Sequence, residues 1–316
     1  MTERSRPSAV VLGSVHMDLI ATAARLPGRG ESVAGGTFSM SPGGKGGNQA
    51  CQLALCGCYT QMLTRLGDDL FGRQLTAALA AKGVDTFFIV ADRRASTGAS
   101  TIFAAEGDYC SIIASGAAAN LREADVDRAR HAIESAGALV LQLELPPRIS
   151  GYAANIARKA GKHVVLNASP APQSFAELPG ELRDGVTILV VNRVEAGRLL
   201  GRAPGDALDA AVRLARRLAV ETVVVTAGAE GSAAVSHGVT ALQPAFPAKL
   251  ADTVGAGDAF LGTFVAGMLD SLPLHQALQR GAAAGALAVS KHGAYDALPT
   301  RYEIDRFLKK SNPAAS

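Results

Sequence analysis

The sequence predicts an α/β protein in which a mainly parallel central sheet lies between helices. Short, continuously apolar segments rich in β-branched residues recur along the chain, and longer segments with helical periodicity separate them. Continuous hydrophobicity is typical of strands that are buried on both faces, as the strands of parallel sheets are. The alternation of strand and helix therefore indicates a doubly wound sheet.

The individual elements follow from these two patterns. Buried strands are predicted at residues 9–15, 138–145, 163–168, 187–191 and 222–226. Helices are predicted at residues 48–55, 70–82, 122–135, 149–159, 207–219, 259–269 and 274–290. Asp206 lies where its side chain can cap one of these helices, and acidic residues occur early in another, as the helix dipole favours.

Two regions break the alternation of strand and helix. Residues 31–41 are rich in glycine and show alternation of apolar and polar residues. Residues 99–115 have the pattern of two strands joined at Glu106, Gly107 and Asp108. Both regions are predicted as antiparallel strands outside the main sheet. We expect segments of about 16–46 and 97–115 to form one small β flap, or lid, within a single domain of residues 1–316.

The composition excludes several classes of function. Hydrophobic residues make up 48% of the 316 residues and charged residues 19%, which allows a large buried core. The net charge of +3 is small against 31 basic and 28 acidic side chains, so nucleic acid is not expected as a partner. No apolar segment approaches the ~20 residues of a membrane span, and no membrane association is expected.

The four cysteines are Cys51, Cys56, Cys58 and Cys110. One residue separates Cys56 from Cys58, whereas common zinc and redox motifs have two, and no second cysteine pair accompanies them. Nothing near the N-terminus resembles a signal peptide. We therefore expect buried or incidental thiols and a cytoplasmic location.

The segment with the clearest chemistry is Asp-Thr-Val-Gly-Ala-Gly-Asp at residues 252–258. A glycine-rich turn into a helix leaves backbone N–H groups free at the positive helix end, which makes an anion hole suited to a phosphate. A carboxylate at Asp258 makes sense there if it accepts a proton from an attacking hydroxyl while the N–H groups hold the transferred phosphoryl group. The alternative is that Asp258 only caps the helix.

A second glycine-rich turn, Pro-Gly-Gly-Lys-Gly-Gly-Asn at residues 42–48, leads into a helix near the start of the chain. It is not a P-loop, because the Gly-Lys-Ser/Thr ending is missing. No Gly-x-Gly-x-x-Gly follows the first strand, which argues against a dinucleotide-dependent oxidoreductase. Lys45 and Asn48 would instead offer donors to a polyhydroxylated ligand.

With both loops in view, the chain resembles the ribokinase-like (pfkB-type) carbohydrate kinase family. The resemblance extends from Gly13 to about Leu308, nearly the whole chain. The matching motifs occur in the family's order at residues 13–18, 27–31 with 43–48, 67–72, 142–144, 192–195, 226–231 and 252–258. The resemblance implies a ribokinase-like fold and ATP-dependent phosphorylation of a sugar hydroxyl.

The resemblance also implies roles for residues of the transfer and sugar sites. Asp258 would be the general base, and the anion hole would be formed by Gly255, Ala256 and Gly257. The sugar-binding positions would be His16, Asp18, Gly44, Lys45, Asn48, Glu144 and Asp258. His16 stands where ribokinases usually carry Asn, so it bears on which sugar is bound.

The same resemblance implies ATP, Mg²⁺ and K⁺ as cofactors. The nucleotide positions would be Asn192, Glu195, Thr226, Gly228, Gly231 and Gly257. Glu195 would organise Mg²⁺ through water, because Mg²⁺ keeps much of its hydration shell. The counterparts of the family's monovalent-cation site are Asp252, Val254, Ala288, Lys291, Gly293 and Ala297, most of them through backbone carbonyls.

The first choice of substrate is ribose, which would be converted to ribose 5-phosphate. The same chemistry on deoxyribose, a ketohexose or a nucleoside is the nearest alternative, and a sugar- or nucleoside-binding protein without turnover is the alternative from another class. A small isolated sheet is marginal and exposes an edge, so the lid strands are expected to pair with a second copy in a homodimer.

Overall fold

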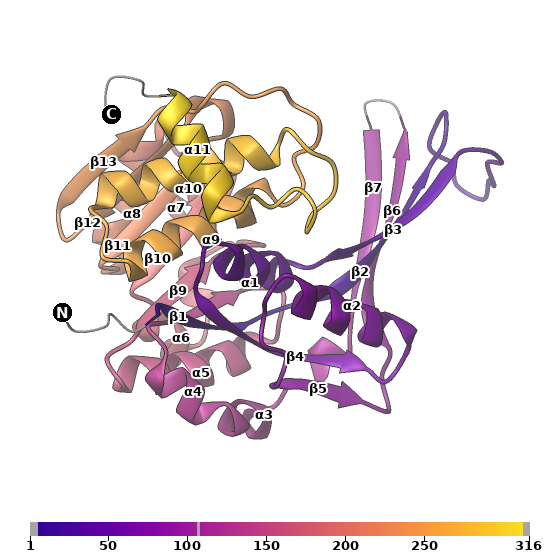
Figure 1. Ribbon diagram of the computed structural model, residues 1–316, viewed down its shortest axis with the longest axis horizontal. Helices are drawn as coiled ribbons and strands as arrows, with labels where there is room; N and C mark the ends of the chain where they lie inside the picture. Colours follow the sequence, from indigo (N-terminus) through magenta and orange to yellow (C-terminus); the bar gives the residue numbers. More distant parts are fainter. Residues whose placement is uncertain (1–5, 106–107, 312–316) are drawn as a thin grey trace.

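The computed structural model describes residues 6–105 and 108–311, and it contains two sheets (Figure 1). The larger sheet has nine strands in the order β13-β12-β11-β10-β9-β8-β1-β4-β5. These strands are β1 (Ser8–Leu12), β4 (Tyr59–Gly67), β5 (Ile89–Asp92), β8 (Ala138–Gln142), β9 (His163–Asn167), β10 (Ile188–Asn192), β11 (Thr222–Thr226), β12 (Ser232–Ser236) and β13 (Val239–Gln243).

The larger sheet is parallel from β5 to β11, and β12 and β13 continue it as antiparallel strands at one edge. The prediction of a mainly parallel sheet is thus confirmed. Because parallel strands end at the same edge of a sheet, the segments that follow β1, β8, β9, β10 and β11 are brought together. This edge holds most of the predicted site.

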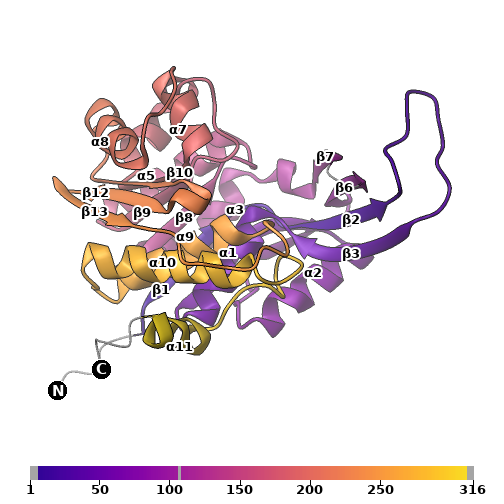
Figure 2. The ribbon, with the colours of Figure 1, turned by 90° about the horizontal axis from the view of Figure 1, so that it is seen from above.

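Helices cover both faces of the larger sheet, as the view from above in Figure 2 shows. One face is covered by α1 (Lys45–Leu55), α2 (Leu70–Ala81), α9 (Ala256–Leu269), α10 (Leu274–Ala288) and α11 (Arg301–Ser311). The other face is covered by α3 (Glu123–Arg128), α4 (Arg130–Ser135), α5 (Pro147–Lys159), α6 (Gly180–Gly185), α7 (Arg193–Leu200) and α8 (Ala207–Leu218). Alternate strand residues enter the two cores: Val10 and Leu12 face one, Ala9 and Val11 the other.

The smaller sheet, which we call the lid, projects from the body in both views (Figures 1 and 2). Its strands, in the order β3-β2-β6-β7, are β2 (His16–Thr22), β3 (Thr37–Gly43), β6 (Thr97–Ala105) and β7 (Asp108–Gly116). The two hairpins are antiparallel, as predicted, but β2 pairs with β6 in parallel. Of the predicted hairpin turn, Glu106 and Gly107 lie outside the described residues.

Several boundaries differ from the prediction for identifiable reasons. β3 begins at Thr37 rather than near residue 31, after Gly35 and Gly36, which have φ of 92° and 115°. The helix predicted at 122–135 is divided at Ala129 into α3 and α4. β4 was not predicted because its buried residues include Thr60, Thr64 and Arg65, which interrupt the apolar run.

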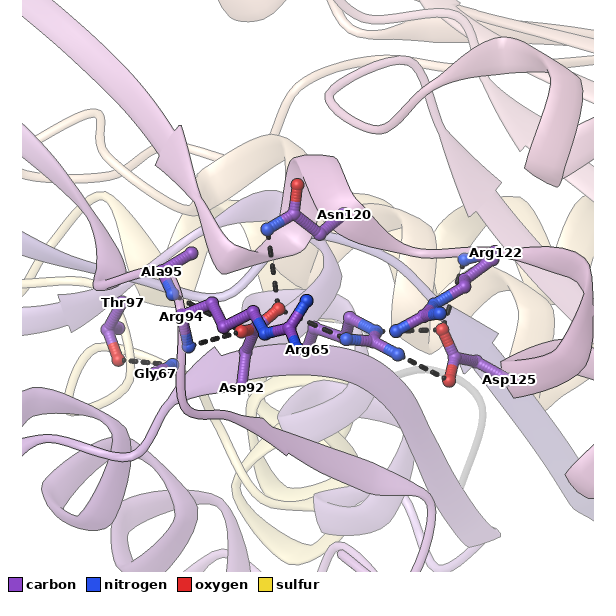
Figure 3. Close-up of polar contacts among 9 residues, drawn as sticks. All are labelled: Arg65, Gly67, Asp92, Arg94, Ala95, Thr97, Asn120, Arg122 and Asp125. Atoms are coloured by element: carbon purple, nitrogen blue, oxygen red, sulfur yellow. Dashed lines mark hydrogen bonds and ion pairs between the residues drawn. The ribbon is translucent and has the colours of Figure 1, made fainter.

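Arg65 ties the base of the β6–β7 hairpin to the larger sheet (Figure 3). Its guanidinium donates to Asp125 through Nε at 2.8 Å and Nη2 at 3.0 Å, and to Asp92 through Nη1 at 3.1 Å. Asp92 precedes β6, whereas Asp125 lies in α3, after β7, so one buried cation joins the chain on both sides of the hairpin. Removing one partner of a buried ion pair costs about 3–5 kcal/mol, because the other charge stays uncompensated.

A second set of hydrogen bonds holds the first residue of β6. Thr97 donates its N–H to Asp69 Oδ2 at 2.8 Å and its hydroxyl to Asp69 Oδ1 at 2.7 Å, while Gly67 N–H donates to Thr97 Oγ1 at 2.9 Å. Asn120, beyond β7, also donates to Asp92, at 3.3 Å. The root of the hairpin is thus anchored at several points.

Within the described part of the chain, none of the helices has the length and apolar character needed to cross a membrane.

Candidate active site

The N-termini of α1 and α9 meet at the carboxyl edge of the larger sheet. Each helix begins after a glycine with positive φ: Gly44 at 93° before α1, and Gly255 at 75° before α9. A Cβ on Gly44 would lie 2.7 Å from the Ser14 carbonyl oxygen, so that position has neither the space nor the backbone conformation for another residue. The helices pack closely because Gly262 of α9 lies against Gln52 of α1.

Asp258, in the first turn of α9, is buried and reaches α1. Asn48 Nδ2 donates to Asp258 Oδ2 at 2.8 Å, and Gln49 Nε2 donates to Oδ1 at 2.8 Å. Burial raises the pKa of Asp258, and the positive charge of Lys45 and the two amide hydrogen bonds oppose that rise. A carboxylate with a raised pKa accepts a proton more readily than an exposed one.

Lys45 lies among acidic groups at the same place. The negative charge of Asp258 is the largest cause that raises the pKa of Lys45, and Glu144 and Glu195 act in the same direction. Glu144, just beyond β8, accepts hydrogen bonds from the Ser14 hydroxyl and, at 3.2 Å, from the Lys45 backbone N–H. The structure therefore brings together the predicted residues of α1, α9 and the β8 edge.

His16 and Asp18 enter the site from the base of the lid. His16 Nε2 lies 3.2 Å from Asp18 Oδ1, and both side chains are about nine-tenths buried. A Cβ on Gly43 would lie 2.2 Å from Asp18 Oδ2, so this glycine makes room for the carboxylate. The structure thus places the side chains of His16 and Asp18 next to each other, in direct contact.

Asn192 and Thr226 end the neighbouring strands β10 and β11, where they are register partners. Asn192 Oδ1 accepts from the Glu195 N–H, and Glu195 Oε2 accepts from the Asn192 N–H, both at 2.8 Å. This reciprocal capping box begins α7 and holds the Glu195 carboxylate at the sheet edge. Asn192 and Glu195 therefore have a structural role, which is to cap the N-terminus of α7.

The three glycines predicted to lie near the nucleotide differ in backbone conformation and in the space available for a side chain. Gly228 has a φ of 56° and begins a short 3₁₀ helix, Gly228–Glu230. A Cβ on Gly231 would lie 2.2 Å from the Gln243 carbonyl oxygen, so the β12–β13 hairpin requires glycine there. In contrast, a Cβ on Gly257 would meet none of the described residues within 4 Å, its own helix backbone and chain neighbours aside. The turn predicted as the anion hole thus borders open space on that side.

The segments predicted to hold a monovalent cation lie side by side. Asp252 Oδ1 accepts from Val254 N–H at 3.0 Å, and Asp252 Oδ2 accepts from Gly293 N–H at 3.2 Å. Lys291 Nζ donates to Glu303 Oε1 at 3.1 Å, and the Ala288 carbonyl accepts from the Lys291 N–H. Asp252 therefore joins the turn before α9 to the segment that contains Gly293 and Ala297.

A family model for the pfkB family of carbohydrate kinases matches residues 6–301. The chain belongs to this family. It is 34% identical over 307 residues to the ribokinase of Haemophilus influenzae, covering 96% of this chain and 99% of that protein. It is also 30% identical over 302 residues to the deoxyribokinase of Salmonella typhimurium, covering 94% and 97%.

The solved structures place this pfkB family kinase in the same fold. The structure of Arabidopsis thaliana ribokinase complexed with ribose and ATP matches it with a TM-score of 0.87 and 31% identity, covering 96% of this chain and 99% of that one. The ribokinase-like fold predicted from the sequence is confirmed.

Three amides of this pfkB kinase were not among the predicted site residues: Gln49 and Gln142, which are buried, and Asn167, which is partly buried. Gln49 contacts Asp258 directly, Gln142 Nε2 donates to Gln49 Oε1 at 2.7 Å, and Gln49 Nε2 also lies 3.2 Å from Asn167 Oδ1. Their positions in the sequence could have identified these three amides. Gln49 follows the predicted site residue Asn48, and Gln142 and Asn167 end apolar strands.

One polar atom at the centre of the site has no partner within the described residues. Asn48 donates to Asp258, but its own Oδ1 is buried and accepts no hydrogen bond from those residues. A buried acceptor left unpaired is costly, and a ligand hydroxyl can satisfy it. In this pfkB kinase the unpaired atom lies on the residue that also bonds the Asp258 carboxylate.

Proposed function

We propose that this kinase transfers the γ-phosphoryl group of ATP to a hydroxyl of ribose, giving ADP and ribose 5-phosphate. The observation that carries the proposal is the buried Asp258 carboxylate in the first turn of α9, with the unpaired Asn48 oxygen beside it. The similarity to ribokinases over nearly the full length of the chain supports ribose as the acceptor.

In the proposed reaction, Asp258 accepts the proton of the attacking sugar hydroxyl. The hydroxyl oxygen forms a bond to the γ-phosphorus while the bond between that phosphorus and the leaving ADP oxygen breaks. The backbone amides of Gly255, Ala256 and Gly257 hold the negative charge of the transferred group at the positive end of α9. Lys45, beside Asp258, adds a positive charge.

The sugar hydroxyls are assigned to the polar groups around this point. Asp18 and Glu144 provide acceptors, Lys45 a donor and Asn48 the unpaired acceptor, with the Gly44 backbone and His16 completing the set. Since hydroxyls both donate and accept, a mixed group of this kind suits a polyhydroxylated ligand better than an apolar one.

The nucleotide is assigned to Thr226, Gly228 and Gly231 at the end of β11 and in the loop after it, and to Gly257 in the first turn of α9. Oxygen ligands suit Mg²⁺, and Glu195 with Asn192 at the sheet edge fits a water-mediated ion. When bound, Mg²⁺ would supply charge neutralisation for the phosphates. The four cysteines are free thiols, which fits the proposed cytoplasmic location.

The first prediction concerns the general base. Asp258→Asn should lower kcat about 10²–10⁴-fold, the scale expected for loss of a positioned base. Nucleotide affinity, measured by calorimetry, should change far less, because the loop amides are retained. Near-native kcat in this variant would show that Asp258 is only a helix cap.

The second prediction concerns a monovalent cation at Asp252, Val254, Ala288, Lys291, Gly293 and Ala297. K⁺ should raise activity at saturating MgATP and Na⁺ should do so poorly, because the ion orders the turn that leads to Gly255. Asp252→Ala should lose this response, since Asp252 joins the two segments of the site. Equal rates in K⁺ and choline chloride, or an unchanged response in Asp252→Ala, would remove the cation from the mechanism.

The third prediction concerns a homodimer formed through the lid. Phe38, Met40, Phe103 and Ile112 are exposed, at 65%, 49%, 39% and 72%. Strand register places all four on the face opposite Asp18. The lid therefore has an exposed apolar face, and β3 and β7 are its edge strands. Such a surface can be buried by packing against the lid of a second copy.

Light scattering should therefore give a dimer at micromolar concentration, and Phe38→Asp should shift it to a monomer. Ser39→Asp, which places the same charge on the opposite face of β3, is the control and should leave the dimer intact. A wild-type monomer with full activity would contradict this assignment.

The fourth prediction concerns the sugar itself, tested by ADP release across a panel of sugars and nucleosides. Ribose should be preferred, and deoxyribose should be used much less well, because buried groups that bond a hydroxyl are left unpaired by an analogue lacking it. The similarity to a deoxyribokinase favours deoxyribose as the second candidate.

His16 provides the discriminating variant, because it pairs with Asp18 at 3.2 Å. If ribose is a poor substrate, the assignment to ribose is wrong although the kinase reaction stands. His16→Asn should then change the ratio of kcat/KM between sugars, whereas an unchanged ratio would show that His16 does not contribute to the choice.

A further inference from the structure

A chain of buried amides leads from the Asp258 carboxylate into the larger sheet. Gln49 is fully buried, and Gln142 is nearly so, at 1% exposure. Gln49 Nε2 donates to Asp258 Oδ1 at 2.8 Å and lies 3.2 Å from Asn167 Oδ1, and Gln142 Nε2 donates to Gln49 Oε1 at 2.7 Å. Four elements, α1, α9, β8 and β9, thus meet in one polar path within an apolar layer.

The carboxylate determines which way each amide points. An ionised carboxylate only accepts hydrogen bonds, so Gln49 must direct its NH₂ group to Asp258 and its oxygen to Gln142. Gln142 must then present its own NH₂ group. Asn167 presents its oxygen to Gln49, and its Nδ2 donates to the Val190 carbonyl at 3.1 Å. The arrangement is self-consistent when Asp258 is ionised.

Asn48 and Gln49 both contact Asp258, but they differ in how many of their side-chain polar atoms have a hydrogen-bond partner. Asn48 keeps a buried Oδ1 that accepts no hydrogen bond from the described residues. The two Gln49 N–H groups are directed to Asp258 and Asn167, and its oxygen accepts from Gln142. Both side-chain N–H groups of Gln49 are thus used and its side chain is fully buried, so we expect any effect on the reaction to act through Asp258.

We propose that Gln49 is a positioning residue that holds the Asp258 carboxylate in its ionised, proton-accepting form and in a fixed orientation. The proposal rests on the assignment of Asp258 as the base. Buried amides are costly unless they are hydrogen-bonded. Both Gln49 N–H groups and its oxygen are paired, whereas Gln142 Oε1 has no partner among the described residues.

The expected direction of the effect follows from the groups around Asp258. Burial and Glu144 raise its pKa, whereas Lys45, Asn48 and Gln49 lower it. Removing the Gln49 donor takes away one of the interactions that lower the pKa of Asp258. The effect of burial is then less compensated, and we expect the pKa to rise further. A base works only when it is unprotonated, so the acidic limb of the activity profile moves to higher pH.

The test compares Gln49→Leu with Gln52→Leu as its matched control, using ribose as the substrate. Gln52 lies one turn further along α1 and is equally buried, but its amide donates to Cys56 Sγ and the Pro299 carbonyl instead. Both variants replace one buried amide with an apolar side chain in the same helix. Only Gln49→Leu removes a donor to Asp258.

The pH dependence of kcat/KM is the measurement, because it reports the free enzyme. In Gln49→Leu the acidic limb should move up by about one pH unit, the scale of one hydrogen bond to a charged group. Activity should therefore fall about tenfold below the limb and recover as the pH rises. In Gln52→Leu the limb should stay in place.

An equal loss at all pH values in Gln49→Leu, or an equal shift in Gln52→Leu, would overturn the proposal. Should Gln49→Leu fail to fold, Gln142→Leu replaces it, since it releases the Gln49 oxygen and should move the limb in the same direction by less. An unmoved limb in that variant would likewise overturn it. Failure of the proposed function is separate, because Asp258→Asn would then retain its kcat.

Discussion

The site depends on holding one ionisable carboxylate, Asp258, away from water at the beginning of a helix. A buried charge is tolerated only when it is paired and hydrogen-bonded. The fold meets this requirement by bringing α1 against α9, so that Lys45 supplies the charge and Asn48 and Gln49 the hydrogen bonds. The glycines at the start of both helices, and Gly262 between them, allow that approach.

Two buried polar clusters serve different purposes in this kinase. Around Arg65, the guanidinium donates to Asp92 and Asp125, and the cluster fixes the root of the β6–β7 hairpin. Because β2 pairs with β6, that root also supports the strand that carries Asp18. Around Asp258, by contrast, the Asn48 oxygen remains unpaired. The first cluster is closed by the protein, whereas the second has an acceptor that no described residue satisfies.

The fold was predictable where burial and sequence pattern agree. The predicted strands at 163–168 and 222–226 match β9 and β11 closely, because both are continuously apolar and covered on both faces. β4 escaped prediction because Arg65 and its neighbouring threonines are polar yet buried. Arg65 is tolerated there through Asp92 and Asp125, which lie 27 and 60 residues away in the chain, so no local pattern reveals it.

The sequence by itself determined the strand and helix periodicities, the family and the glycine turns, because these depend on neighbouring residues and their allowed dihedral angles. Only the tertiary structure decided the contacts of Asp258. Gln49 is 209 residues from Asp258 in the chain, and their hydrogen bond exists because α1 packs on α9. His16 and Asp18, in contrast, are two residues apart in β2, so the period of the strand already places them on one face. Distances between side chains follow from packing, which periodicity does not encode.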